Sequence, residues 1–107
     1  VMRAHLPWQV DVAIEPFKGH PNIFAWYLCD EPDHAMMTVP PAEMRLATRR
    51  IKEIDPKRPT WGVVMSWADA NMFQYADTVD ILATDIYPIE DANTKKPLTM
   101  VSEKVDM

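Results

Sequence analysis

Cysteine, glycine and basic residues are scarce in this sequence, and each scarcity excludes something. The 107 residues include one cysteine, Cys29, so an internal disulfide cannot form. Only two glycines are present, which excludes a glycine-rich phosphate-binding loop. Eleven Lys and Arg stand against 16 Asp and Glu, a net charge of -5. This balance argues against a nucleic-acid-binding surface, which needs a surplus of basic side chains on one face.

Long apolar runs are also missing. No run approaches the roughly 18 to 20 residues that a membrane-spanning helix needs, so no membrane partner is predicted. Residues 1–5 have no signal-peptide pattern, and the compartment, with the extracellular or periplasmic space included, stays open. His34 lies close to several acidic residues, but no ligand spacing recurs elsewhere. We therefore predict neither a metal site nor a cofactor.

Helical and strand patterns alternate along the chain, which is typical of βαβ units on a parallel sheet. Apolar spacing and turn residues predict helices over 8–18, 41–54, 70–75 and 97–107, and strands over 23–29, 60–65 and 79–87. The run 23–29 is continuously apolar, as expected of a strand covered on both faces. The sequence therefore predicts an α/β fold.

Three strands with their helices make up only part of a barrel or of an open sheet. A (β/α)₈ barrel takes about 250 residues, so this chain covers less than half of one. Both outer strands would present unpaired backbone edges. We expect further barrel segments or a second copy of the chain to cover those edges.

Two adjacent carboxylates, Asp30 and Glu31, come directly after the apolar strand 23–29. In parallel α/β folds, catalytic groups are displayed at the carboxyl ends of strands, because the βα loops build the site there. The pair is therefore a candidate active-site element. The alternative is structural: Asp30 would cap the next loop, and Glu31 would be solvated.

The segment His20–Asp33 resembles the fourth-strand segment of clan A glycoside hydrolases, in which an apolar strand with a Trp ends in Asn-Glu-Pro or Asp-Glu-Pro. The turn Asp55–Pro59 and the segment Asp80–Pro88 look like the following helix-to-strand turn and the sixth strand of that group. The resemblance implies that residues 1–107 are a single incomplete segment of a (β/α)₈ TIM barrel. This segment would hold about three βα units, from the third helix through part of the sixth.

The same resemblance implies that Glu31 is the general acid/base in a hydrolysis of O-glycosidic bonds with retention, and that the partner is a carbohydrate substrate. The nucleophile of the clan lies at the end of the seventh strand, so this segment would supply the proton donor alone. Asp30 stands where the clan more often has Asn and is expected to contact the substrate. An ionised Asp accepts hydrogen bonds but cannot donate them. An adjacent Asp-Glu pair also occurs in hexosaminidases that use the acetamido group of the substrate as nucleophile, and this alternative stays open.

Regular strand alternation would put Tyr27, Cys29 and Glu31 on one side and Asp30 on the other. Asp30 would then reach the site only through local twist or a bulge. Regular alternation therefore predicts that Asp30 faces away from Tyr27, which a structure tests directly.

Two aromatic residues are candidate walls of the site. Tyr87 shares a side with Asp85 at the end of the strand 79–87, and the resemblance implies contact with the nucleophile or the sugar. Trp67 follows the strand 60–65 and could stack on a pyranose ring. Plain packing is the alternative for both. Two rival functions also stay open, a non-catalytic carbohydrate-binding barrel and a metal-dependent TIM-barrel hydrolase.

Overall fold

The computed structural model describes residues 7–34, 38–65, 69–89, 92–93 and 96–106. Helices and strands alternate within these ranges. In chain order they are α1 (Pro7–Ile14), the short 3-10 helix η1 (Glu15–Phe17), β1 (Trp26–Asp30), α2 (Pro41–Ile54), β2 (Thr60–Met65), α3 (Asp69–Tyr75), β3 (Ile81–Asp85) and α4 (Met100–Val105). The predicted order of elements is confirmed. The first and third strands and the last helix are shorter than the sequence predicted.

The three strands form one parallel sheet in the order β1-β2-β3. Consecutive parallel strands require crossover connections, and α2 and α3 supply them. The predicted α/β architecture with a parallel sheet is confirmed at this level, whereas closure into a barrel stays a prediction. Among the described strands, β1 and β3 each have a partner on one side only.

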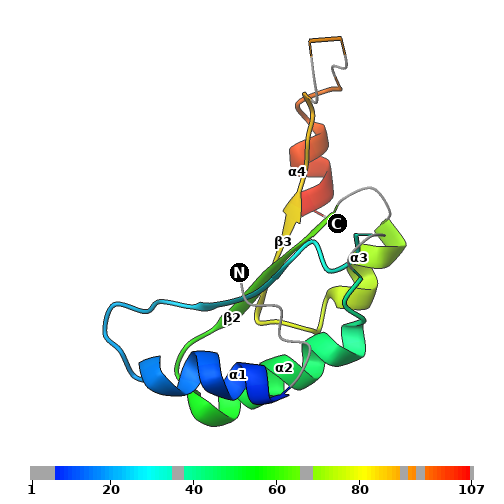
Figure 1. Ribbon diagram of the computed structural model, residues 1–107. Helices are drawn as coiled ribbons and strands as arrows, with labels where there is room; N and C mark the ends of the chain where they lie inside the picture. Colours follow the sequence, from blue (N-terminus) through cyan, green and yellow to red (C-terminus); the bar gives the residue numbers. More distant parts are fainter. Residues whose placement is uncertain (1–6, 35–37, 66–68, 90–91, 94–95, 107) are drawn as a thin grey trace.

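Helices α1, α2 and α3 lie along one side of the sheet (Figure 1). The alternation of burial along β2 agrees with this arrangement, because Thr60, Gly62 and Val64 are buried while the residues between them are half-buried. The prediction that the first strand is covered on both faces is therefore wrong for the described residues. Their helices cover one face, and we call the other the open face, which carries Trp61, Val63 and Met65 in β2.

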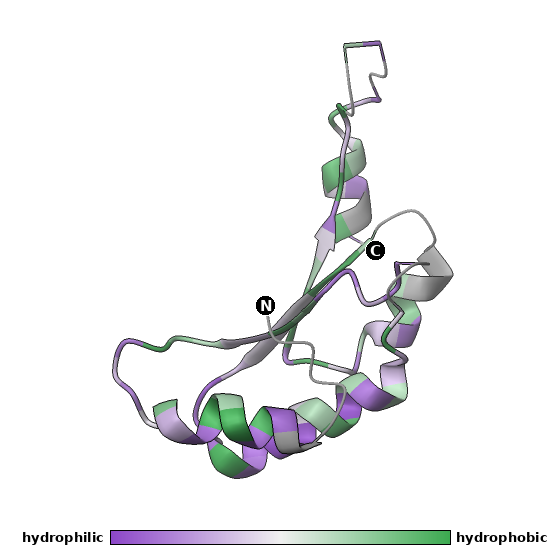
Figure 2. Ribbon diagram, viewed as in Figure 1, coloured by the Kyte–Doolittle hydropathy of each residue, from purple (hydrophilic) through white to green (hydrophobic). Residues whose placement is uncertain are grey.

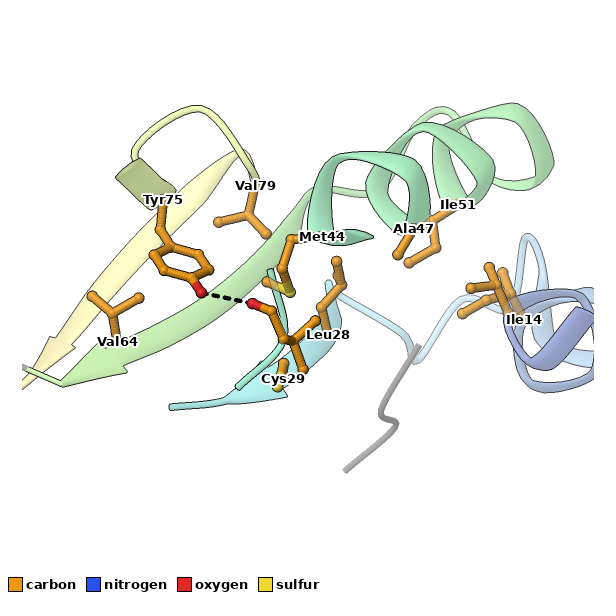
Figure 3. Close-up of a cluster of buried hydrophobic side chains, with 11 residues drawn as sticks. Ile14, Leu28, Cys29, Met44, Ala47, Ile51, Val64, Tyr75 and Val79 are labelled. Carbon is orange, nitrogen blue, oxygen red and sulfur yellow. Dashed lines mark hydrogen bonds between the residues drawn. The ribbon is translucent and has the colours of Figure 1, made fainter. Parts of the chain in front are cut away.

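The core lies between the sheet and α2. Met44, Ala47 and Ile51 of α2 belong to one buried cluster with Leu28 of β1 and Val64 of β2, and Met44 lies beside Leu28 (Figure 3). Their spacing follows the 3.6-residue period that the sequence predicted for this helix. Apolar and polar residues alternate around α1 and α2 (Figure 2), as expected for helices with one face against a sheet. Within the described residues, no helix has the length and apolar character that crossing a bilayer requires.

A buried aspartate fixes the turn between α2 and β2. Asp55 is 4% exposed and accepts hydrogen bonds from Trp26 Nε1 and Arg58 Nη1, both at 3.0 Å. Burial acts to raise the pKa of Asp55, but these two donors and the charge of Arg58 outweigh it, and the pKa is lowered. The turn 55–59 is therefore built around an ionised carboxylate with a cationic partner.

A second aspartate, directly before β3, also fixes a turn by binding a cationic side chain and a backbone donor. Asp80 Oδ2 accepts the backbone N–H of Thr60 at 2.8 Å and lies 2.9 Å from Lys52 Nζ. The hydrogen bonds from Lys52 and Thr60 lower the pKa of Asp80, although burial opposes them. The amino-terminal ends of β2 and β3 are thus joined to each other and to α2.

Candidate functional site

Glu31 lies at the carboxyl end of β1 in a backbone conformation that is unusual for its residue type. Its φ of 45° is positive, which is uncommon for a residue other than glycine. The Glu31 N–H donates to Val63 O at 2.8 Å, and its carbonyl accepts the N–H of His34 at 2.9 Å. The chain therefore keeps its pairing with β2 up to Glu31 and then turns sharply away. Backbone strain of this kind is concentrated at functional sites.

A β-bulge in β1 changes which side chains share a face. Between the pairs Tyr27–Trp61 and Asp30–Val63, β1 advances three residues while β2 advances two. The extra residue brings Asp30 to the side of Tyr27, and the Tyr27 hydroxyl donates to Asp30 Oδ1 at 2.8 Å. The prediction that Asp30 faces away from Tyr27 is therefore wrong. The predicted alternation also fails for Cys29, which lies in the buried core.

Two aromatic rings cover part of the open face below the carboxylates. Tyr27 and Trp61 are stacked with centroids 4.3 Å apart and an interplanar angle of 27°. Because they are direct partners across β1 and β2, the stack is a cross-strand pair of the kind that stabilises sheets. The sequence analysis did not select Trp61. The alternation of β2, with small or β-branched residues on the opposite face, was the signal that could have found it.

Asp85 at the end of β3 binds Tyr87 and is one of the charges that act on Glu31. The Tyr87 hydroxyl donates to Asp85 Oδ2 at 2.9 Å, so the predicted shared side of these two residues is confirmed. The negative charge of Asp85 also affects Glu31, because it raises the pKa of Glu31. Residues from the first and third strands therefore meet across the carboxyl end of β2. Asp85 was mentioned in the sequence analysis only as the neighbour of Tyr87.

The surroundings of Glu31 favour its protonated form. Burial is the largest cause that raises its pKa, and the negative charges of Asp30 and Asp85 add to it, while His34 acts in the opposite direction. Hydrogen bonding to Asp85 is the smallest of the causes that raise the pKa of Glu31. Glu31 can therefore donate a proton at a pH where an ordinary glutamate is already ionised.

The segment after Glu31 is anchored at two points. Asp33 Oδ1 accepts the N–H of Met65 at 2.9 Å, which ties this loop to the end of β2. The Tyr75 hydroxyl, from α3, donates to Val39 O at 2.6 Å, the hydrogen bond that is dashed in Figure 3. It also lies 3.3 Å from the carbonyl of the buried Pro32. The sequence analysis selected neither Asp33 nor Tyr75 as an anchor, because both contacts cross more than 30 residues. Together they hold the turn that carries Glu31.

Other candidates fall outside this cluster. Trp67 lies outside the described residues, so its predicted contact with a sugar stays a prediction. An apolar pocket of about 480 Å³ lies between α3, β3 and α4, with Met72, Phe73, Leu82 and Val105 in its wall. It holds no acidic group and lies on the helical side of the sheet. Within the described ranges, no three His, Cys, Asp or Glu side chains are placed to hold a metal ion.

Comparisons with known proteins find a similar fold but no matching family. No protein-family model matches the chain, and no curated protein matches it. Among solved structures, the chain is similar to a glycosyl hydrolase family 2 (GH2) member from Bacteroides cellulosilyticus DSM 14838, with a TM-score of 0.59 and 20% identity. The match covers 74% of this chain and 11% of that chain. At this identity the likeness shows the fold alone: most of this chain follows the backbone course of a small part of a glycosyl hydrolase.

Proposed function

We propose that this chain is a segment of a (β/α)₈ catalytic domain that hydrolyses O-glycosidic bonds, with Glu31 as the general acid/base. The observation that carries the proposal is the position of Glu31 together with its backbone conformation and its raised pKa. Glu31 lies at the carboxyl end of a parallel strand, in a strained backbone conformation, with a raised pKa. A raised pKa, a strained backbone and this place in the fold are each characteristic of catalytic acids in parallel α/β enzymes.

Glycosidic hydrolysis explains why a neutral glutamate is needed. The leaving oxygen must receive a proton while an oxocarbenium-like centre is stabilised by a second, ionised carboxylate. Glu31 is suited to the first role, since its surroundings favour the protonated form. The likeness to part of a glycosyl hydrolase supports a fold in which such a residue has access to a sugar.

The second carboxylate is not provided by the neighbours of Glu31. In retaining enzymes the two carboxyl groups are about 5 to 5.5 Å apart. Both acidic neighbours already have a partner, since Asp30 accepts the Tyr27 hydroxyl and Asp85 accepts the Tyr87 hydroxyl. We therefore expect the nucleophile to lie outside these 107 residues, and we expect the isolated chain to be inactive.

Asp30, Trp67 and Tyr87 are the proposed substrate contacts. With one oxygen bound to Tyr27, Asp30 keeps its other oxygen to accept a hydrogen bond from a sugar hydroxyl or an acetamido N–H. Since the bulge brings Asp30 to the open face, a substrate-assisted hexosaminidase is the second candidate function. Activity restricted to N-acetylhexosaminides would favour this candidate over a retaining enzyme with its own nucleophile.

The test is hydrolysis of aryl glycosides by the full-length protein and its Glu31→Gln variant. With poor leaving groups, we expect kcat to fall by about 10² to 10⁴, the usual contribution of general acid catalysis. With good leaving groups the first bond cleavage needs little protonation, so the loss should be much smaller. Glu103→Gln, an exposed change of the same kind in α4, is the matched control. Equal activity of wild type and Glu31→Gln on both substrate types would show that Glu31 is an ordinary strand-end carboxylate.

A further inference from the structure

The Tyr27 side chain has two partners, one for its ring and one for its hydroxyl. The ring stacks on Trp61 of β2 with centroids 4.3 Å apart, and the hydroxyl donates to Asp30 Oδ1 at 2.8 Å. The stack stabilises the pairing of β1 with β2, and a phenylalanine could supply it equally well. Packing therefore explains the ring of Tyr27 but not its hydroxyl.

We propose that Tyr27 is a positioning residue that orients the Asp30 carboxylate for contact with a hydrogen-bond donor of the sugar, an inference that rests on the proposed function. Asp30 is exposed at the end of β1, where a carboxylate without a partner turns between several conformations. The hydroxyl of Tyr27 fixes one oxygen of Asp30, and the stack on Trp61 fixes the ring that carries this donor. A side chain already held in its binding conformation loses less freedom when the substrate binds.

The bulge in β1 makes the contact between Tyr27 and Asp30 possible. Asp30 follows Tyr27 by three residues, so regular alternation would place the two side chains on opposite faces. Because β1 advances three residues while β2 advances two, Asp30 comes to the side of Tyr27. Bulges next to active sites often change the direction of a side chain in this way. The bulge therefore turns Asp30 toward the site, and Tyr27 holds it there.

The same hydrogen bond decides which group of a sugar Asp30 can recognise. Burial raises the pKa of Tyr27, and the bond to Asp30 adds to this effect, so the hydroxyl keeps its proton and stays a donor. With Oδ1 bound to Tyr27, Asp30 presents Oδ2, and an ionised carboxylate can only accept hydrogen bonds. The matching substrate group is a hydroxyl or an acetamido N–H. A sugar without this group should be a poorer substrate, because it leaves the fixed carboxylate without its partner.

The test compares an aryl glycoside with analogues that each lack one hydroxyl or the acetamido group, as substrates of the full-length protein. All carry the same good leaving group, which needs little protonation, so the comparison measures the substrate contact apart from the proton donor. The deficit of an analogue is the factor by which its kcat/KM falls below that of the unmodified glycoside. The analogue whose deficit disappears in Asp30→Ala identifies the group that Asp30 binds. For this analogue we expect a deficit of about tenfold in wild type and about threefold in Tyr27→Phe, as for a hydrogen bond to a charged group and its partial loss.

Tyr27→Phe keeps the ring and its stack on Trp61, so it removes the hydroxyl alone. In an Asp30→Ala background, Tyr27→Phe should not lower kcat/KM for the unmodified glycoside further, because the group that it positions is gone. A further loss there would overturn the role of Tyr27, and so would an equal deficit in wild type and Tyr27→Phe or a deficit that no analogue loses in Asp30→Ala.

The outcomes for Tyr27 and for the proposed function can be told apart. If Tyr27 fails these tests while Glu31→Gln still loses turnover of poor leaving groups, the proposed role of Glu31 stands and the role of Tyr27 does not. If the full-length protein turns over no glycoside, the proposed function fails, and this inference fails with it.

Discussion

Carboxylates at the two ends of the same sheet have opposite surroundings. At the amino-terminal ends of the strands, Asp55 and Asp80 each bind a cationic side chain and backbone or indole donors, and their pKa values are lowered. At the carboxyl ends, Asp30, Glu31 and Asp85 are close to one another, and the pKa of Glu31 is raised. Within the described residues, no Lys or Arg forms an ion pair with these three side chains.

This difference gives the carboxylates at the two ends opposite effects on stability. Carboxylates with partners at the amino-terminal end connect turns and helices to the sheet and favour the folded state. A glutamate crowded by like charges has the opposite property, because its ionised form is disfavoured in the folded protein. In parallel barrels, residues at the amino-terminal ends of the strands serve stability and those at the carboxyl ends serve catalysis, and the proposed role of Glu31 would follow this rule. The following substitutions test it, from the largest expected effect to the smallest.

Asp55→Ala should have the largest effect on stability. It leaves the guanidinium of Arg58, whose side chain is 15% exposed, without its carboxylate partner, and Trp26 Nε1 without an acceptor. Breaking a buried pair in this way costs about 3 to 5 kcal/mol. Urea unfolding measures the loss, and Asp55→Asn, which keeps the shape and one acceptor, should lose less. If Asp55→Ala lost no more free energy of unfolding than the same change at an exposed aspartate does, that result would contradict the idea that carboxylates at the amino-terminal ends of the strands stabilise the fold.

Tyr75→Phe tests the connection between the helical layer and the turn that carries Glu31. The substitution leaves the Val39 carbonyl, at present 2.6 Å from the hydroxyl, without this donor in a buried position. An unsatisfied buried group costs about 1 to 3 kcal/mol. Hydrogen exchange should show the loss concentrated in the segment between β1 and α2. Uniform loss of protection across the whole sheet would contradict a local anchor.

Glu31→Gln should stabilise the protein at neutral pH. Because the folded-state pKa of Glu31 is raised above the ordinary glutamate value, its favourable contribution is present below the ordinary pKa and is lost as the pH rises through the folded-state pKa. The free energy of unfolding of wild type relative to Glu31→Gln should therefore fall across this window. The expected gain of Glu31→Gln at neutral pH is about 0.5 to 2 kcal/mol, the usual range for relieving such a site. A difference between the two proteins that does not depend on pH would contradict the raised pKa.

Glu31→Gly and Glu31→Ala separate the backbone strain from the charge. Both remove the carboxylate, but only glycine adopts a φ of 45° without strain. We expect the glycine variant to be more stable than the alanine variant by about 0.5 to 1 kcal/mol, the cost of this conformation less the entropy cost of glycine. Chemical denaturation of the two variants gives the difference directly. Greater stability of the alanine variant would show that the turn relaxes once the glutamate is gone.

Periodic patterns accounted for most of the fold. The spacing of Met44, Ala47 and Ile51 predicted α2 with its observed bounds, and the β-rich run 60–65 predicted β2. These predictions succeeded because helix and strand periods depend on local backbone geometry. The predicted bounds of β1 and β3 were wrong at both ends, because pairing with β2 decides where a strand begins and stops. The open face was not foreseen, because an apolar strand has the same sequence whether one face or both are covered.

For the candidate site, the sequence by itself determined that two carboxylates follow an apolar strand, and the family resemblance then selected Glu31 of the two. Only the tertiary structure decided which side chains lie near Glu31. A one-residue bulge brought Asp30 to the side of Tyr27, and the pairing of β2 with β3 brought Asp85 to Glu31 over 54 residues of chain. Local sequence fixes which groups are present, whereas the register of paired strands fixes which groups meet. The proton affinity of Glu31 depends on the register, because this affinity is set by burial and by charges that lie close in space.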